Sequence, residues 1–402
     1  MTVEGEVPRT LSFLDQAKAL APQIEKMAGD IEQSRRLPTT LVETMTRAGL
    51  FRLLIPRTLG GEEADPATLV RVVEEISCAD GAAGWCVALI GEYSVFSGYL
   101  SPETAREIYG SDPNARTAGA LRPSGVAVEV EGGYRVTGRW QLGSGTQHAS
   151  WIVGGCRIMA GDQPRLRPDG TPLSRVLLFP AAACEIIDTW DSIGLRGTGS
   201  HDYAVSDLYV PVSRSISFRD APVAPGPLYS MPTILLFGAV LAAVPLGIAR
   251  HAINILTELA MARSTGRSGG GALRNDPTLQ ANLGHAEATL RSGRAFLYEA
   301  LADAWQTLCA GEELAIAQRA TVWLASTHAA VAAKQATDMM FSVGSSASPY
   351  KSFGLERCVR DIHAAAQHIC LAMGNYPMAG QAYLGLDMRS TPLLLADDRN
   401  DS

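Results

Sequence analysis

Apolar residues change their spacing twice along this 402-residue chain. They recur at helical intervals from about residue 10 to 110, alternate in short β-rich runs from 115 to 220, and return to helical spacing after 230. These changes predict an N-terminal helical domain over residues 1–114, a central β domain over 115–222 and a C-terminal helical domain over 223–402. The expected fold class is therefore α+β.

The C-terminal zone holds four long helical patterns, at residues 231–265, 276–310, 312–343 and 354–373. Short breaks rich in Gly and Ser join them, which is typical of an up-down four-helix bundle. In the central zone, VAVEVEGGYRVTGRW alternates around Gly132-Gly133 and predicts a β-hairpin. With the strands that follow, this zone is expected to form a barrel-like β domain between the two helical ones.

Composition excludes several classes of function. The formal net charge is −7, with acids and bases interspersed, so we expect no nucleic-acid partner and no anionic membrane surface. Seven cysteines without a C-x-x-C pair argue against a disulfide framework and a structural zinc site, and favour the cytoplasm. No basic stretch followed by an apolar run marks a signal peptide. The most apolar segment, 234–249, is short for a membrane span and predicts a buried core helix.

The first candidate site is the Gly143-Ser144-Gly145 turn within WQLGSGTQHASWI. Small residues there let a planar ligand approach the backbone, whose N–H groups can donate to it. The Ser144 hydroxyl can donate to or accept from a ring nitrogen. A plain Gly/Ser turn between two strands explains the same residues equally simply.

The second candidate is the pattern at 355–373. On one continuous helix, Arg357, Asp361 and His368 share a stripe, so His368 can exchange a proton at a pocket and Asp361 can orient it. A packing histidine satisfied by Asp361 or by a carbonyl remains the alternative. His363 lies roughly 140° around the helix from His368, which argues against a shared metal site.

Loops supply the remaining candidates. Arg263 with neighbouring glycines can clamp a phosphate, and Ser345 and Ser346 can donate hydroxyl groups to it. Thr198 in GLRGTGSHD offers another donor beside a tight turn. Solvated loops and turn chemistry explain these residues as well. No HExxH, Walker or G-x-S-x-G motif is present, so the sequence gives no support for a hydrolase or an ATPase.

Four loose markers occur in one order: GLFRLLIPRTLGGEEADP, GGYRVTGRW, GLRGTGSHDYAVSDLYVP and VRDIHAAAQHI. Together they resemble the acyl-CoA dehydrogenase superfamily over nearly the whole chain, including its helical, β and four-helix-bundle domains. Two features resemble its oxygenase branch, the two-component flavin monooxygenases of phenols, indoles, thiophenes and amino sugars. They are W-x-x-x-S-G, from Trp140 to Gly145, and R-D-x-H-x-x-x-x-H, from Arg360 to His368.

An absence separates the two branches. A dehydrogenase needs a carboxylate beside the flavin to remove a proton from its thioester substrate. Counted from the Arg-Asp pair, the usual glutamate position falls at Ile369, and the alternative position at 234–237 holds no acid. The sequence therefore argues against ordinary dehydrogenase chemistry.

The resemblance implies reduced flavin, delivered by a separate NAD(P)H:flavin reductase, that reacts with O2 through a flavin hydroperoxide. It implies that Ser144 binds flavin N5 and that His368 assists oxygen activation or proton transfer, with Asp361 orienting it. The turn residues Gly143 and Gly145, together with Thr198, would complete the flavin site.

The resemblance further implies that Arg263, Ser345 and Ser346 hold the phosphate end of the flavin, one element coming from a neighbouring subunit of a homotetramer. These phosphate ligands favour FAD over FMN.

The expected substrate is a small aromatic or heteroaromatic molecule. Many relatives place a histidine in the first domain over the substrate, where this chain reads IGEYSVFSGY, so Glu92 or Tyr93 takes that place. Phe237 is assigned to the same pocket. Two alternatives remain: an acyl-CoA dehydrogenase or oxidase with a displaced base, and a flavin-binding or scaffold homologue without activity.

Overall fold

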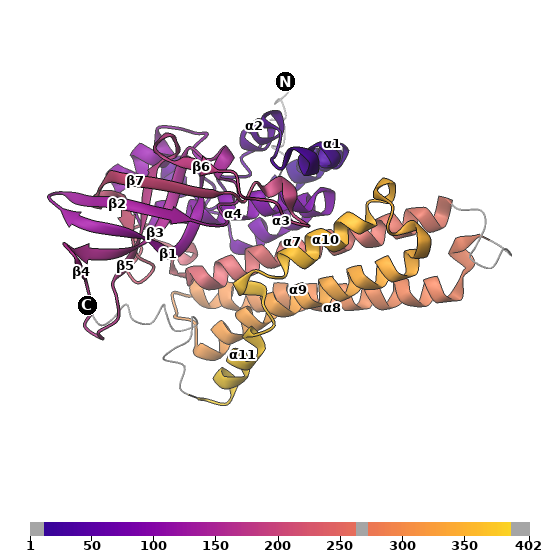
Figure 1. Ribbon diagram of the computed structural model, residues 1–402. Coiled ribbons are helices and arrows are strands. Elements are labelled where there is room, and N and C mark those ends of the chain that lie inside the picture. The colour runs from indigo at the N-terminus through magenta and orange to yellow at the C-terminus, as the bar shows by residue number, and fades with distance from the viewer. Residues whose placement is uncertain (1–11, 263–271, 387–402) are drawn as a thin grey trace, which may run out of the picture.

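The computed structural model describes residues 12–262 and 272–386. Helices come first, a β-sheet follows, and long helices form the rest (Figure 1). The sheet lies at one end of the molecule, and the long helices extend away from it (Figure 1). The α+β order predicted from apolar spacing is therefore confirmed.

The N-terminal helices begin where side chains satisfy their first N–H groups. Asp65 accepts from the N–H of Thr68 and precedes Pro66 at the first helical position, both ordinary start signals. Asp80 caps the next helix through the N–H of Ala83. The elements are α1 (Phe13–Ser34), α2 (Thr39–Arg47), α3 (Pro66–Ala79), α4 (Gly81–Tyr93) and α5 (Pro102–Ala105).

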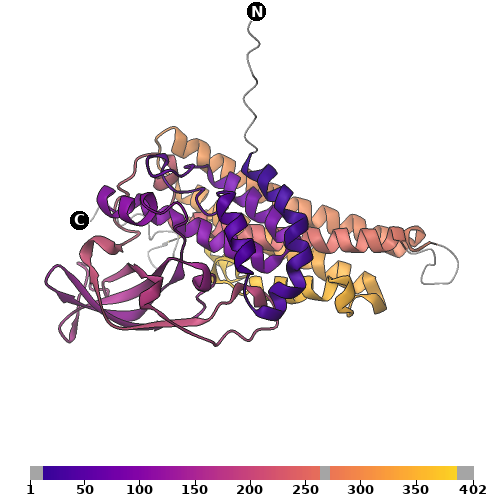
Figure 2. The same cartoon turned by 90° about the horizontal axis from the view of Figure 1, so that it is seen from above.

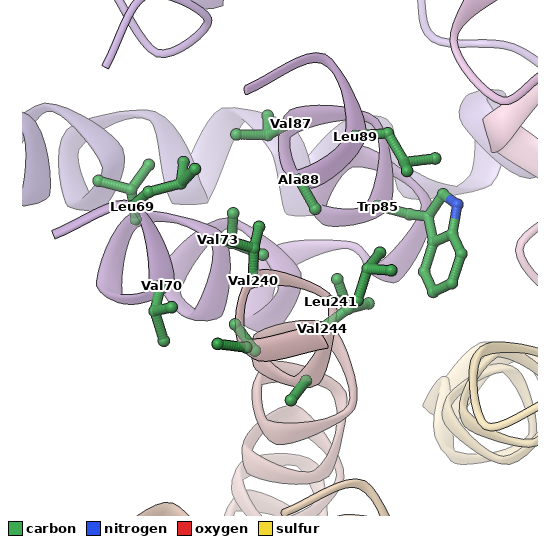
Figure 3. Packing of buried hydrophobic residues seen from close by; sticks show 14 of the residues in the cluster. Leu69, Val70, Val73, Trp85, Val87, Ala88, Leu89, Val240, Leu241 and Val244 are labelled. Carbon is green, nitrogen blue, oxygen red and sulfur yellow. The ribbon is translucent and has the colours of Figure 1, made fainter. Parts of the chain in front are cut away.

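Helix α4 is buried along its whole length, which is unusual for a helix of a small domain. It packs with α3 and with the long helix α7 (Thr233–Ala262), as Figure 3 shows for Val73, Ala88 and Val240. Gly247 permits a close approach of α7 to α3, because a Cβ there would lie 2.3 Å from the carbonyl oxygen of Glu74. These contacts join the first domain to the bundle in one core.

The central domain is a mixed sheet. Its described strands run in the order β6-β7-β2-β1-β3-β5-β8, with β4 paired to β3. The predicted hairpin is confirmed, since Val130 pairs with Gly133 across a turn in which Gly132 has φ +75°. Strands β1 and β3 run parallel, and the other pairs are antiparallel. The strands are β1 (Thr117–Val130), β2 (Gly133–Trp140), β3 (Trp151–Ala160), β4 (Gln163–Pro164), β5 (Ser174–Pro180), β6 (Glu185–Ile187), β7 (Asp202–Pro211) and β8 (Ser215–Ile216).

After the short helix α6 (Pro227–Ser230), the bundle consists of α7, α8 (Pro277–Cys309), α9 (Ile316–Gly344) and α10 (Leu355–Ala365), with α11 (Asn375–Tyr383) beside it. Seen from above, the N-terminal helices lie across these long helices (Figure 2). Helix α7 is long and apolar enough to cross a membrane, yet 89% of its most apolar window is buried inside the protein. It is the core helix that the pattern at 234–249 predicts.

The last predicted helix is shorter than expected. Helix α10 ends at Ala365, whereas the pattern continues to residue 373. The backbone of His368 is extended, with φ −65° and ψ 137°, and its side chain accepts from the N–H of Cys370. A side chain that binds a nearby backbone N–H favours a cap over helix continuation. The single stripe expected for Arg357, Asp361 and His368 is therefore wrong.

Candidate active site

In the turn between β2 and β3, the backbone N–H groups donate to carbonyl oxygens of the protein itself. The N–H of Gly143 donates to His201 O at 2.9 Å, that of Ser144 to Leu142 O at 2.9 Å, and that of Gly145 to Thr198 O at 3.1 Å. The expectation that these groups donate to a planar ligand is therefore wrong for this structure. What the turn leaves available is the Ser144 side chain, which is 5% exposed.

Trp85 of α4 meets Ser144 across the domain boundary. Its indole N–H donates to the Ser144 hydroxyl at 3.2 Å. The same ring contacts His368 edge-on, with centroids 5.7 Å apart and planes at 70°. Trp85 thus brings together the two residues that the sequence offered as separate candidates. Figure 3 shows its ring projecting from α4, away from Leu69 and Val70.

Trp85 does not figure among the candidates from the sequence. Its local signal is a single large ring in the small-residue stretch GAAGWCVAL. Such a ring usually signals packing rather than a site. Only the position of α4 against β2 and the end of α10 reveals its second contact surface.

His368 is a neutral imidazole. Burial lowers its pKa to about 4, so it carries no proton charge near neutral pH. Its Nδ1 accepts from the N–H of Cys370 at 3.3 Å, which assigns the ring proton to Nε2. The Nε2–H is then the group that this histidine offers to a ligand.

Asp361 binds a different partner from the one expected. Its Oδ1 accepts from the N–H of Leu195 at 2.6 Å, which ties α10 to the loop before β7. Burial raises the pKa of Asp361 to about 7, and the nearby carboxylate of Asp80 adds to the effect. Because the hydrogen bond of Asp361 goes to the loop, Asp361 does not orient His368 directly in this structure.

Asp361→Asn is expected to change how stability depends on pH. The folded pKa of Asp361 is above its value of about 3.9 in unfolded chains, so its stabilising effect is complete below that value and is lost as pH rises toward about 7. Asparagine keeps the bond to Leu195 without ionising. The free energy of unfolding of the variant, relative to that of the wild type, should therefore rise by about 1 kcal/mol for each pH unit across this window. Urea unfolding at both ends of the window measures this, and parallel curves would contradict it.

The substrate-pocket candidates are buried together. Phe237 of α7 lies 5.8 Å from the Tyr93 ring, and both contact Phe96, in a cluster that Phe218 extends. Glu92, on α4, is 1% exposed, so it is not a surface acid. Its Oε2 is buried and has no hydrogen-bond partner within the described residues. Burial raises the pKa of Glu92 well above its usual range, which keeps the carboxyl protonated.

The residues assigned to a phosphate group do not lie at this site. Ser345 and Ser346, in the 3₁₀ turn Ser345–Ala347, are exposed at the end of α9. His368 lies beyond the other end of α10, whose 11 residues span about 16 Å. Arg263 falls outside the described residues. Thr198 lies near Ser144 instead, but its hydroxyl binds protein groups, Leu195 O at 2.8 Å and Ser200 at 2.6 Å.

His363 and His368 bind different partners. His363 Nε2 lies 3.0 Å from Asp338 Oδ1, away from His368. Within residues 12–262 and 272–386, no group of three or more His, Cys, Asp and Glu side chains is placed to hold a metal ion. A cavity of about 110 Å³ opens between α1, α3 and α7, lined by residues such as Glu25, Glu75 and His251. It contains none of the candidate residues.

Comparison with known proteins shows which family has this sequence and fold. Residues 11–98 match the family model described as acyl-CoA dehydrogenase, N-terminal domain, and residues 239–373 match acyl-CoA dehydrogenase, C-terminal domain. The indole-3-acetate monooxygenase of Pseudomonas putida is 35% identical over 89% of this chain and 90% of its own length. The flavin-dependent monooxygenase oxygenase subunit HsaA of Rhodococcus jostii is 30% identical over 93% of this chain and 98% of its own. The structure of XiaF from Streptomyces, in complex with FADH2 and glycerol, has a TM-score of 0.85 at 25% identity, covering 93% of this chain and 95% of XiaF.

Proposed function

This chain belongs to the acyl-CoA dehydrogenase family, in its branch of flavin-dependent monooxygenases, and we propose that it oxygenates a small aromatic or heteroaromatic compound with reduced flavin and O2. One observation carries this proposal. Trp85, which is buried, contacts both Ser144, from the β domain, and the partly buried His368, from the end of the bundle. The names of the relatives, which include an indole-3-acetate monooxygenase, support an aromatic substrate.

The site residues fit the polar edge of a flavin ring. Ser144, Trp85 and His368 are neutral hydrogen-bonding or aromatic groups, and such groups match the N–H, C=O and ring surfaces of a flavin. When bound, reduced flavin supplies the electrons with which one atom of O2 enters the substrate and the other leaves as water. Ser144 would bind N5, and His368 would hold a proton at Nε2 facing the reacting oxygen. The aromatic cluster around Phe237 excludes water from the substrate side.

The two positions at which a dehydrogenase would carry its base both lie in the described part of the chain, and neither holds a carboxylate. Ile369 stands at the usual glutamate position and is 72% exposed. Glu92 is a buried acid on α4, and burial raises its pKa well above the usual range, which disfavours the ionised form that a base requires. The monooxygenase proposal requires no carboxylate base.

The flavin is proposed to be FAD, delivered by a separate reductase, and the assembly a homotetramer. Since Ser345 and Ser346 lie a helix length away from His368, they are better placed to hold the phosphate end of a neighbouring subunit's flavin. Large apolar side chains are exposed near the end of the bundle, as expected of a subunit contact. They are Ile369, Met373 and Leu384, which are 72%, 70% and 76% exposed. Light scattering should give four times the 42.7 kDa chain mass.

Glu92 is proposed to hydrogen-bond the substrate. Trp85, Leu89 and Glu92 follow at intervals of four and three residues, so they share one face of α4, about 10 Å from first to last. Figure 3 shows the first two side chains on the same side of the helix. The carboxyl then lies on the face that carries the flavin partner Trp85, close to Tyr93, and offers an O–H to a polar group of an aromatic ligand.

Glu92→Leu is expected to raise KM about tenfold, because it removes one buried hydrogen bond to the substrate. It should also raise the free energy of unfolding by about 1 kcal/mol, because it removes an unpaired buried acid. Glu92→Gln keeps a donor and should retain most of the affinity. Steady-state kinetics and urea unfolding of the three proteins measure both effects. An unchanged KM in Glu92→Leu would remove Glu92 from the substrate site.

The function itself is tested with purified protein, reduced FAD generated by an independent reductase, and indoles and phenols as candidate substrates. Products formed under isotopically heavy O2 are analysed by mass spectrometry. Incorporation of one heavy oxygen atom into a product is the expected result. Anaerobic bleaching of oxidised FAD by an acyl-CoA thioester, without oxygen incorporation into any compound, would favour the dehydrogenase alternative instead.

A further inference from the structure

Three buried hydroxyl groups form a chain that leads away from the Trp85 contact. Ser144 Oγ lies 2.6 Å from Ser200 Oγ, which lies 2.6 Å from Thr198 Oγ1. Thr198 donates to the carbonyl oxygen of Leu195 at 2.8 Å. None of the three hydroxyl residues is more than 5% exposed, so their protons are shared among protein atoms.

The carbonyl at the end fixes the direction of every bond in the chain. A carbonyl oxygen only accepts, and each hydroxyl has one proton to donate. The Thr198 proton goes to Leu195 O, so Ser200 must donate to Thr198, and Ser144 must donate to Ser200. The Trp85 N–H also points at Ser144 and only donates. Ser144 therefore faces any further ligand as an acceptor, because its own proton is already used.

The Leu195 peptide is itself held in place. Its N–H donates to Asp361 Oδ1 at 2.6 Å, and its carbonyl oxygen also accepts from the Trp190 indole N–H and from the Thr198 backbone N–H, each at 3.1 Å. The carbonyl oxygen thus accepts three bonds, one of them from the Thr198 hydroxyl, and the peptide cannot turn over without breaking four hydrogen bonds. The orientation of the Leu195 peptide, which is bound to Asp361 of α10, therefore fixes the direction of the hydrogen bonds between the three hydroxyl groups.

We propose that Ser200 and Thr198 make Ser144 an obligate acceptor and that the site thereby selects reduced flavin over oxidised flavin. This inference rests on the proposed function, in which Ser144 faces flavin N5. In reduced flavin, N5 carries a hydrogen and donates, which complements an acceptor. In oxidised flavin, N5 has only a lone pair, so two acceptors meet and the buried pair is left without a proton. Ser200 and Thr198 are positioning residues that act through Ser144.

The test compares dissociation constants of reduced and oxidised FAD, measured anaerobically by titration, for the wild type, Ser200→Ala and Thr198→Val. The wild type should bind reduced FAD more tightly. Ser200→Ala removes the acceptor of the Ser144 proton, and Thr198→Val lets the whole chain reverse. In both variants Ser144 becomes free to donate to oxidised N5. The ratio of the two dissociation constants, oxidised over reduced, should fall about tenfold in each.

Two controls separate this effect from general damage. Thr337→Val removes a buried hydroxyl that binds only Ala333 O in its own helix α9, and it should leave the ratio unchanged. Thr198→Ser keeps a hydroxyl at position 198 and should keep the wild-type ratio of the two dissociation constants. The inference would be overturned if Ser200→Ala and Thr198→Val keep the wild-type ratio, or if they lose affinity for reduced and oxidised FAD equally. Either result would leave the proposed function standing. A wild type that binds no reduced flavin would overturn the proposed function.

Discussion

His368→Ala is expected to lower product formation by about 100-fold or more while leaving the affinity for reduced flavin nearly unchanged. The imidazole is neutral, since its pKa is about 4, and its proton is assigned to Nε2 by the bond between Nδ1 and Cys370. Removing it removes the group proposed to exchange a proton with the reacting oxygen. The hydrogen bond from Trp85 to Ser144 does not depend on it. Oxygen consumption should then yield hydrogen peroxide in place of product.

The matched control for this variant is His363→Ala. His363 lies five residues earlier on α10, and its Nε2 bonds to Asp338 rather than to any residue of the site. It should retain the coupling of the wild type. Product, hydrogen peroxide and NADH are quantified in the same assay with a saturating reductase. Native product formation by His368→Ala would show that the assigned role is wrong.

Gly194→Ala is expected to lower the free energy of unfolding by about 3 kcal/mol. A Cβ at this buried position would lie 2.0 Å from the carbonyl oxygen of Arg360 and 2.7 Å from the backbone nitrogen of Asp361. Both are backbone atoms of α10, so no side-chain rotation relieves the clash. The loop must move away from α10, which breaks the bond between Leu195 and Asp361 on which the hydroxyl chain rests.

Gly29→Ala is the control, because nothing lies within 4 Å of a Cβ at Gly29 in the middle of α1. It should raise the free energy of unfolding by up to about 1 kcal/mol, since alanine loses less backbone freedom on folding. Thermal and urea unfolding measure both variants. Native stability in Gly194→Ala would mean that the contact between the loop and α10 is looser than the structure indicates.

Local sequence patterns were sufficient to predict the helices and strands and their order along the chain. The hairpin at Gly132-Gly133 and the helices α7, α8 and α9 follow from apolar spacing and turn residues, which act within one segment. Ser144 and His368 could also be found, because the residues around each form a pattern that resembles a known family. The local pattern was misleading at His368. It predicted one helix over 355–373, but the His368 side chain accepts from the backbone N–H of Cys370 and the helix ends before it.

The sequence by itself determined the three-part helix–sheet–bundle order and the absence of a carboxylate at the two dehydrogenase positions, and it offered Ser144 and His368 as candidate site residues. The tertiary structure alone decided that Trp85 connects them, that Asp361 binds Leu195, and that Glu92 is buried, its Oε2 having no hydrogen-bond partner in the described part of the chain. The physical reason is that hydrogen-bond partners and desolvation depend on which segments meet in space. Trp85 and Ser144 are 59 positions apart, and Leu195 and Asp361 are 166 apart, so no local spacing encodes either contact.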